Sequence, residues 1–116
     1  MENSIILPIF NAEKTLALVL EKLVHTLPEN SEIIVVDDCS TDNSSAIAKK
    51  FPIRFVQQEE NRGPSATRNT GARMAEGKNL IFVDSDVELE TDSFTRMLDR
   101  LEKNPDILGI HGLPAE

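Results

Sequence analysis

The sequence has little of what several common protein classes require. Cys39 is the one cysteine, so no internal disulfide forms, and with only His25 and His111 beside it a Cys/His zinc site is excluded. The five glycines form neither a Gly-x-Gly-x-x-Gly fingerprint nor a Walker A loop, which excludes dinucleotide oxidoreductases and P-loop kinases. A metal ion in this protein must therefore be held by carboxylates.

Long hydrophobic runs and an excess of positive charge are also missing. The longest apolar runs have about six residues, against the roughly 20 that cross a bilayer, and residues 1–3 lack the basic start of a signal peptide. We therefore expect a soluble, cytoplasmic chain, which leaves open a parent protein held at the cytoplasmic face of the membrane. The formal net charge of -8 argues against nucleic acid as a partner.

The pattern of apolar residues predicts the fold class. The 116 residues, 40% of them hydrophobic, suffice for a single domain with one core. Short apolar runs alternate with segments of helical periodicity, which predicts an α/β fold: a mostly parallel sheet of four to five strands with flanking helices. Strands are expected at residues 4–8, 32–36, 53–56 and 80–83, with a fifth starting at 107–110. Helices are expected at residues 16–27, 46–48, 64–76 and 94–101, the second capped by Thr41 or Asp42.

Charged residues collect where the predicted strands end. In an open parallel sheet ligands bind outside the carboxyl ends of the strands. Arg62, Arg68 and Arg73 lie on or before the helix that follows the third strand. We therefore expect this edge to bind a divalent cation and an anion together. The carboxylates at the same edge are those of Glu13, Asp37, Asp38, Asp42, Asp84 and Asp86.

The tripeptide Asp84-Ser85-Asp86 is the candidate metal site. Residues i and i+2 of an extended segment point to the same side, so the two carboxylates can hold one magnesium or manganese ion. An isolated tripeptide of this kind more often forms a turn and caps a helix. Its position directly after a fully apolar strand favours the metal site.

Two further groups of residues allow two interpretations each. Asp37 and Asp38 either accept a hydrogen bond from a ligand base or bind a cation, or else cap loop amides. Residues 61–65 place a helix amino terminus beside arginines, an arrangement suited to a diphosphate. Arg62 and Arg73 can equally be solvated surface charges, whereas Arg68 lies one turn inside the helix and is the stronger candidate.

Four motifs in this order resemble those of family 2 glycosyltransferases, which have a GT-A fold with a Rossmann-like nucleotide-binding half. They cover residues 7–13, 34–42, 61–69 and 82–86, so the resemblance extends over nearly the whole chain. It implies that residues 1–116 bind a nucleotide-diphosphate sugar, with a UDP-sugar as the first candidate, through Mg²⁺ or Mn²⁺. Glycosyl transfer leaves a nucleoside diphosphate, and a divalent cation with an arginine stabilises the charge that develops on it.

The resemblance also implies roles for single residues. Asp38 accepts a hydrogen bond from the base, and Phe10 and Glu13 line the base and ribose pocket. Arg68 lies near the nucleotide, Asp84 lies against the ribose side, and Asp86 ligates the metal that bridges the diphosphate. The other residues expected at the nucleotide are Pro8, Asn11 and Ser85, and Asp84 is also a candidate metal ligand.

The sequence departs from the family after the Asp-x-Asp motif. Complete members continue with an acceptor half that carries the general base and often a Gln-x-x-Arg-Trp type motif, and neither is present here. We therefore expect the donor-binding half of an inverting glycosyltransferase, in which no catalytic residue is assigned and whose complete protein transfers the sugar to a saccharide or lipid acceptor. Whether this half is itself an enzyme is left open. A half fold leaves apolar surface uncovered, which predicts a homo-oligomer.

Two other functions share parts of this pattern. A receiver-type signalling domain also has an acidic pair after a strand, but it needs a later lysine, and the Asp-Ser-Asp tripeptide would have no role in it. A regulatory or structural module that keeps a donor-like fold without catalysis is the third interpretation. The sequence leaves the sugar, the acceptor and the base undetermined, because Asp38 can accept from uracil or guanine.

Overall fold

The computed structural model describes residues 2–83, in which strands and helices alternate. Neighbouring strands all pair in parallel, in the order β3-β2-β1-β4. The predicted α/β fold with a mostly parallel sheet is confirmed, while the expected helix at 94–101 and strand at 107–110 lie outside the described residues. The elements are β1 (Asn3–Ile9), α1 (Leu16–Thr26), β2 (Ser31–Asp37), α2 (Ser44–Ala48), β3 (Arg54–Gln57), α3 (Pro64–Met74) and β4 (Asn79–Phe82).

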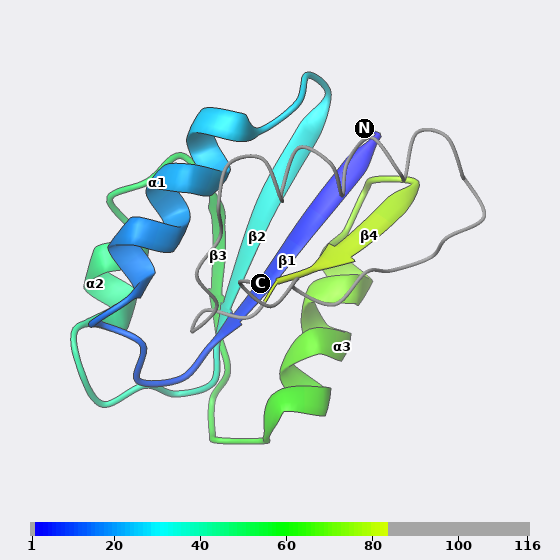
Figure 1. Cartoon of the computed structure of the whole chain (residues 1–116). Coiled ribbons are helices and arrows are strands. Elements are labelled where there is room, and N and C mark those ends of the chain that lie inside the picture. The colour runs from blue at the N-terminus through cyan, green and yellow to red at the C-terminus, as the bar shows by residue number, and fades with distance from the viewer. Residues whose placement is uncertain (1, 84–116) are drawn as a thin grey trace, which may run out of the picture.

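Helices cover both faces of the sheet. Figure 1 shows α1 and α2 on one face and α3 on the other. The central strands β1 and β2 are therefore buried on both sides, which explains their nearly continuous apolar sequences. The predicted apolar stripe of α1 packs against one face of these strands and forms the main core. Its buried members are Leu16, Val19, Leu20 and Leu23.

The other helix layer approaches the sheet closely. A Cβ atom on Gly71 of α3 would lie 2.5 Å from Cγ2 of Ile6 and 3.2 Å from Cγ2 of Val36, so only glycine fits there. Pro64 is the first residue of α3 and follows Gly63, whose φ of 94° lies in a region that favours glycine. The helix begins where the sequence predicts but ends at Met74 rather than near residue 76.

The chain changes from one face of the sheet to the other between β1 and β4. The segments that link β1 to β2 and β2 to β3 carry α1 and α2 on one face, whereas α3 links β3 to β4 across the other face (Figure 1). In an open parallel sheet, ligands bind at the carboxyl side of such a switch point. The topology therefore directs the search for a site to the loop after β1.

Two local details differ from the sequence prediction. Parallel pairing runs from Asn3 with Ser31 to Ile9 with Asp37, so β1 and β2 are each longer than their apolar runs. The residue that caps α2 is Asn43, not Thr41 or Asp42, and its side chain makes no capping hydrogen bond. Asp42 instead accepts from the N–H of Ser44.

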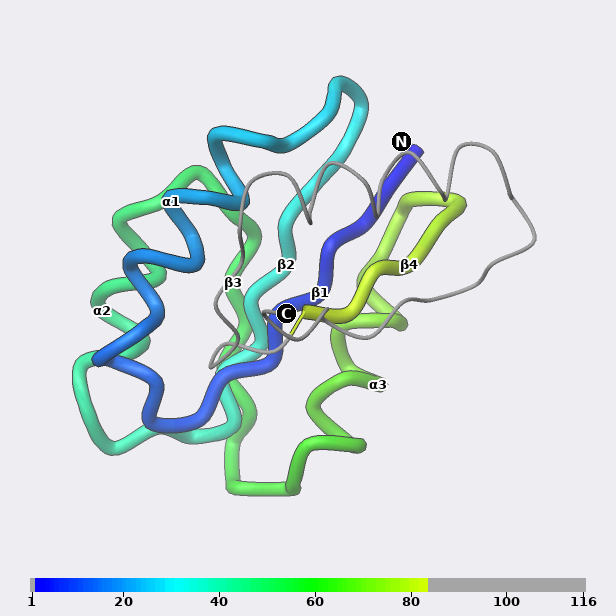
Figure 2. The backbone as a smooth tube through the Cα atoms, viewed as in Figure 1, coloured from blue at the N-terminus to red at the C-terminus, as the bar shows by residue number. Residues whose placement is uncertain are grey.

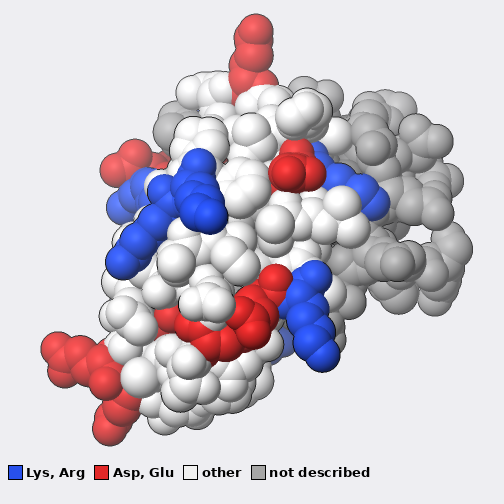
Figure 3. Space-filling view, turned by 90° about the vertical axis from the view of Figure 1, so that its left-hand side faces the viewer, with Lys and Arg blue, Asp and Glu red and all other residues white. Residues whose placement is uncertain are grey.

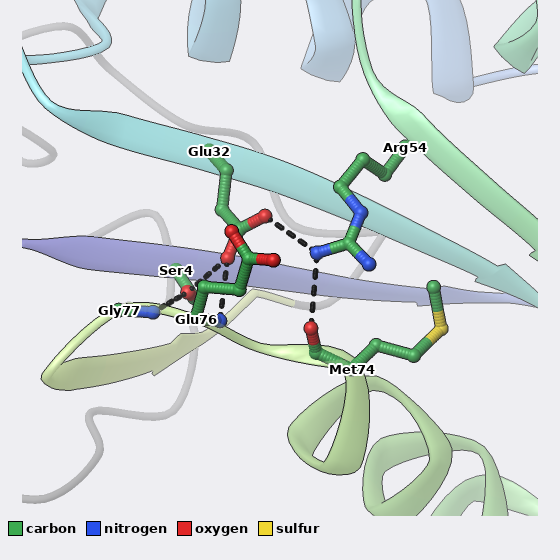
Figure 4. Close-up of polar contacts among 6 residues, drawn as sticks. All are labelled: Ser4, Glu32, Arg54, Met74, Glu76 and Gly77. Carbon is green, nitrogen blue, oxygen red and sulfur yellow. Dashed lines mark hydrogen bonds and ion pairs between the residues drawn. The ribbon is translucent and has the colours of Figure 1, made fainter. Parts of the chain in front are cut away.

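The amino edge of the sheet is closed by a buried polar network (Figure 4). Oε2 of Glu32 accepts from Oγ of Ser4 at 2.6 Å and from the N–H of Glu76 at 2.8 Å, and Oε1 accepts from Nη1 of Arg54 at 2.8 Å. The same Nη1 donates to the carbonyl of Met74. Burial raises the pKa of Glu32, but the hydrogen bonds from Ser4, Glu76 and Arg54 outweigh it, so the pKa is lowered.

The described surface exposes few large apolar side chains. Phe10 and Leu18, which are 51% and 54% exposed, are the large hydrophobic residues exposed within residues 2–83. The homo-oligomer predicted from uncovered apolar surface stays a prediction. None of the helices in this part of the chain combines the length and the apolar character needed to cross a bilayer.

Candidate functional site

A cleft of about 880 Å³ lies at the carboxyl edge of the sheet. Its walls come from the end of β1 and the loop after it, the loop after β2, and the first turns of α3. Its volume falls in the range of small-molecule sites. Asp84, Ser85 and Asp86 lie outside the described residues. The lining residues that the sequence singled out for a nucleotide are Pro8, Phe10, Asn11, Glu13, Asp38 and Arg68.

The loop after β1 gives the cleft an aromatic wall. Phe10 follows the last residue of β1 and is half exposed, although phenylalanine is usually buried. Pro8 is partly buried on the same wall. An exposed ring beside polar groups offers a flat ligand ring a surface on which to stack.

Asp38 holds the segment before α3. Asp38 is 4% exposed, and its Oδ1 accepts from the N–H of Arg62 at 2.8 Å while its Oδ2 accepts from the N–H of Gly63 at 2.9 Å. Of the two interpretations left open, these contacts show the capping of loop amides. Each carboxylate oxygen has a second lone pair, so Asp38 keeps acceptor capacity toward the cleft.

The sequence predicted that free N–H groups at the start of α3 would bind a diphosphate, but the same contacts leave the amides of Arg62 and Gly63 unavailable for that purpose. The amides of Arg62 and Gly63 are occupied by Asp38, and Pro64 has no N–H. Arg68 lines the cleft and is partly buried. Arg73 is exposed in the last turn of α3, at the far end of the helix, so the arginine of α3 that lines this cleft is Arg68.

Asp37 is not among the residues that line the cleft. It is fully buried, and its Oδ1 accepts from both the N–H and the hydroxyl of Ser40. Within residues 2–83 no group donates to its buried Oδ2. Cys39, between Asp38 and Ser40, has a φ of 68°, a conformation that residues other than glycine rarely adopt. The two neighbouring aspartates therefore differ, since only Asp38 lines the cleft.

Two loops are joined by a set of hydrogen bonds that we call the loop clasp, formed by residues 11–13 and 40–44. The loops after β1 and β2 run side by side at the lower left of Figure 2. Three consecutive backbone N–H groups of the first loop donate to side chains of alternate residues of the second. The pairs are Asn11 N to Ser40 Oγ at 2.8 Å, Ala12 N to Ser44 Oγ at 2.8 Å and Glu13 N to Asp42 Oδ2 at 3.2 Å.

The clasp is reciprocal. The N–H of Thr41 donates to Oδ1 of Asn11 at 2.8 Å, and the N–H of Asn43 donates to Oε2 of Glu13 at 3.2 Å. Desolvation raises the pKa of Asp42, but hydrogen bonds from Ser44 and from the Glu13 N–H lower it overall. Asn11 and Glu13, which the sequence assigned to the nucleotide, thus also fix the loop in which they lie. The sequence did not indicate these contacts between the two loops.

The sequence model of the family described as "Glycosyl transferase family 2" matches residues 4–112. The chain belongs to glycosyl transferase family 2. It is 34% identical over 105 residues to an uncharacterized glycosyltransferase of Haemophilus influenzae, a match that covers 90% of this chain and 36% of that protein. The four-stranded parallel sheet with flanking helices is the Rossmann-like part of the GT-A fold of this family.

Solved structures of other glycosyltransferases have the same fold. TarS 1–349 of Staphylococcus aureus, in complex with UDP-GlcNAc, has a TM-score of 0.79 and 31% identity, covering 90% of this chain and 32% of that one. Glucosyl-3-phosphoglycerate synthase of Mycobacterium tuberculosis, in complex with Mn²⁺, UDP and glucosyl-3-phosphoglycerate, has a TM-score of 0.76 and 23% identity, covering 89% and 40%. The chain therefore spans about a third of the length of these proteins.

The described part of the family 2 chain provides no complete metal site. Within residues 2–83 no group of three His, Cys, Asp or Glu side chains is arranged to hold a metal ion. Asp38 and Asp42 use their oxygens for loop amides. Asp84 and Asp86 carry the hard oxygen donors that Mg²⁺ and Mn²⁺ prefer, so the chemistry of this donor set suits such an ion.

Charge on the face covered by α1 and α2 is divided into small groups. Figure 3 shows this side of the molecule, where Lys and Arg side chains alternate with groups of Asp and Glu. Neither sign forms one continuous field on the described part of this face. The residues that the sequence singled out for a nucleotide therefore gather at the cleft and not on this helical face.

Proposed function

We propose that this chain is the donor-binding part of an inverting glycosyltransferase, which binds a nucleotide-diphosphate sugar and, in the complete protein, transfers the sugar to a saccharide or lipid acceptor. The observation that carries the proposal is the cleft in which an aromatic ring, a buried carboxylate and an arginine meet at the switch point of the sheet. The UDP-GlcNAc bound by TarS, at 31% identity, makes a UDP-sugar the first candidate donor.

The base and ribose occupy the side of the cleft formed by β1 and β2. Phe10 provides the stacking surface, with Pro8 beside it. Asp38 accepts from an N–H of the base with the lone pairs that its loop amides leave unused. Because Asp38 is 4% exposed and its carboxylate is held by two amides, the carboxylate is preorganised for a donor on the base.

The diphosphate occupies the side formed by α3. Arg68 lines the cleft on this side, and its guanidinium would offer a charge-assisted contact to a phosphate oxygen. Asp84 and Asp86, with Ser85 between them, would hold Mg²⁺ or Mn²⁺, which when bound neutralises charge on the leaving nucleoside diphosphate. Transfer also needs a general base near the acceptor hydroxyl, which we place on the acceptor side of the complete enzyme. For this chain itself we propose donor binding.

Titration calorimetry of the whole chain with UDP in manganese buffer tests the proposal. We expect measurable binding that falls at least about tenfold in Arg68→Ala, because a charge-assisted phosphate contact is lost. Arg73→Ala is the matched control, an exposed arginine at the other end of the same helix, and should bind as the wild type does.

The metal arm uses the same measurement. Asp86→Ala, or removal of the ion with chelator, should abolish most of the heat. Acetyl phosphate, which a receiver domain would accept, should give none. An absence of heat for both UDP and GDP with manganese would contradict the proposed function.

A further inference from the structure

The position of the nucleotide wall depends on residues that do not line the cleft. Phe10 and Glu13 lie on a loop of irregular structure, which by itself has many conformations available. Asn11 between them has a φ of 49°, in the left-handed region that asparagine tolerates at a cost. Something outside this loop must therefore keep it in place.

Ser40 connects this loop to the rigid sheet. Its Oγ accepts from the N–H of Asn11 at 2.8 Å and donates to Oδ1 of Asp37, the last residue of β2. Asp37 is fully buried and also accepts from the N–H of Ser40 at 3.0 Å, so the hydroxyl has a fixed orientation. One of the connections from β2 to the loop after β1, the one that starts at Asp37, thus passes through this hydroxyl group.

We propose that Ser40 is a positioning residue for the nucleotide. Through Asp37 on one side and the amide of Asn11 on the other, it holds the loop that presents Phe10 and Glu13 to the ligand. Ser40 is not among the residues that line the cleft, so it acts through the loop rather than by touching the nucleotide. The inference rests on the proposed function, because it assigns the base and ribose to this wall.

Ser44 holds the next amide of the same loop in the same way. Ser44 accepts from the N–H of Ala12, is fully buried and also lies outside the cleft lining. Ser40, in the loop after β2, and Ser44, the first residue of α2, therefore hold neighbouring amides of the loop after β1. Removal of either hydroxyl frees part of the wall and should weaken the ligand contacts that the wall makes, while the start of α3 keeps its own contacts with Asp38.

Ser40→Ala tests the proposal, with affinities for UDP and UMP measured in manganese buffer. We expect both affinities to fall by the same factor, about tenfold, because the lost contacts involve the base and ribose that the two ligands share. Ser40→Thr keeps a hydroxyl and should restore binding. Ser45→Ala, which removes a partly buried hydroxyl of α2 outside the cleft lining, is the matched control.

Amide hydrogen exchange gives a second measurement that needs no nucleotide. The N–H of Asn11 should exchange faster in Ser40→Ala, and the N–H of Gly63, held by Asp38, should not change. Should Ser40→Ala fail to fold, Ser44→Ala carries the same test with the amide of Ala12.

The possible failures are distinguishable. A wild-type chain that binds neither nucleotide contradicts the proposed function. A wild-type chain that binds UDP, together with a Ser40→Ala variant that binds it equally well, overturns the positioning role. A variant that loses UDP affinity and keeps UMP affinity also overturns it, because the change then concerns the diphosphate.

Discussion

A buried carboxylate accepts hydrogen bonds from backbone N–H groups at each end of β2, but the two carboxylates differ in their other partners. At the amino edge Glu32 accepts from the N–H of Glu76, just after α3, and at the carboxyl edge Asp38 accepts from the amides of Arg62 and Gly63, just before α3. One helix is thus held at both ends by carboxylates of one strand and its continuation. Glu32 is paired with Arg54, whereas no ion pair with Asp38 is found among residues 2–83.

This difference predicts that Glu32 serves only the stability of the fold, whereas Asp38 also serves ligand binding. A buried carboxylate that already has a cation partner has its charge compensated inside the fold and offers nothing to a ligand. Asp38 has two amides and an open cleft beside it, so its remaining charge is available to a bound molecule. Substitutions at the amino edge should therefore change stability alone, and those at the carboxyl edge should change stability and binding together.

The largest effect on stability is expected at Gly77. A Cβ there would lie 2.6 Å from the carbonyl carbon of Asn3 and from the nitrogen of Ser4, both backbone atoms that cannot move aside. We expect Gly77→Ala to lower the free energy of unfolding by about 3 kcal/mol or more in urea titrations. Lys78→Ala, at an exposed neighbour, should have almost no effect, and equal effects of both variants would contradict the close packing.

Glu32→Gln should have the next largest effect, without a change in binding. An amide replaces one acceptor oxygen by a donor, so at least one of the contacts with Ser4, Arg54 and the Glu76 N–H is lost, at about 2 kcal/mol at pH 7. UDP affinity should stay at the wild-type value. Glu21→Gln, at an exposed carboxylate of α1, is the matched control.

The same variant predicts a pH dependence. The pKa of Glu32 in the folded chain is lowered below the ordinary value of 4.5, so the unfolded state takes up the proton first as the pH falls. The stabilisation is fully present above pH 4.5 and is lost as the pH falls through the lower, folded pKa. The gap in unfolding free energy between wild type and Glu32→Gln should therefore narrow on acidification, and a constant gap would contradict the network.

Asp38→Asn should affect both properties. Asparagine keeps one acceptor oxygen and places a donor against the other loop amide, so we expect a loss of about 1.5 kcal/mol in unfolding free energy. Calorimetry should also show weaker UDP binding, in contrast to Glu32→Gln. If stability is unchanged while binding falls, Asp38 serves only the ligand and the comparison of the two edges is wrong.

The smallest effect is a gain. Cys39 adopts a φ of 68°, which glycine adopts without the steric cost that a Cβ imposes. Cys39→Gly should therefore raise the free energy of unfolding, by about 0.5 kcal/mol after the greater flexibility of the unfolded chain is subtracted. Cys39→Val, with a branched Cβ at the same φ, should lower the free energy of unfolding, and the opposite order would contradict the assigned backbone.

Much of the fold was predictable because it depends on periodicity. The stripe of α1 and the apolar runs of β1 and β2 follow from side-chain spacing, and the structure confirms them. The loop clasp leaves no such signal: its hydrogen bonds join backbone N–H groups to polar side chains, show no periodicity and span 29 to 32 residues of sequence. Whether Asp38 caps amides or binds a ligand was undecidable for another reason, because a carboxylate suits both purposes.

The sequence predicted which residues form the candidate site but not how their side chains contact one another. The sequence singled out Phe10, Asn11, Glu13, Asp38 and Arg68, and all of them line one cleft. Their roles at a nucleotide stay predictions. The contacts that Asn11 and Glu13 make with the second loop could not be predicted from the sequence, because the sequence does not show which N–H group an acceptor side chain will meet.

The separations of these contacts along the chain suggest an order of assembly. The clasp needs only β1, β2 and their loops, whereas the amino edge needs partners 44, 73 and 76 residues apart. Closing a longer loop costs more entropy, and the longer segment also emerges later during synthesis. The nascent chain can therefore set the wall around Phe10 before β4 docks beside β1, so the aromatic half of the cleft is among the first parts of the molecule to take shape.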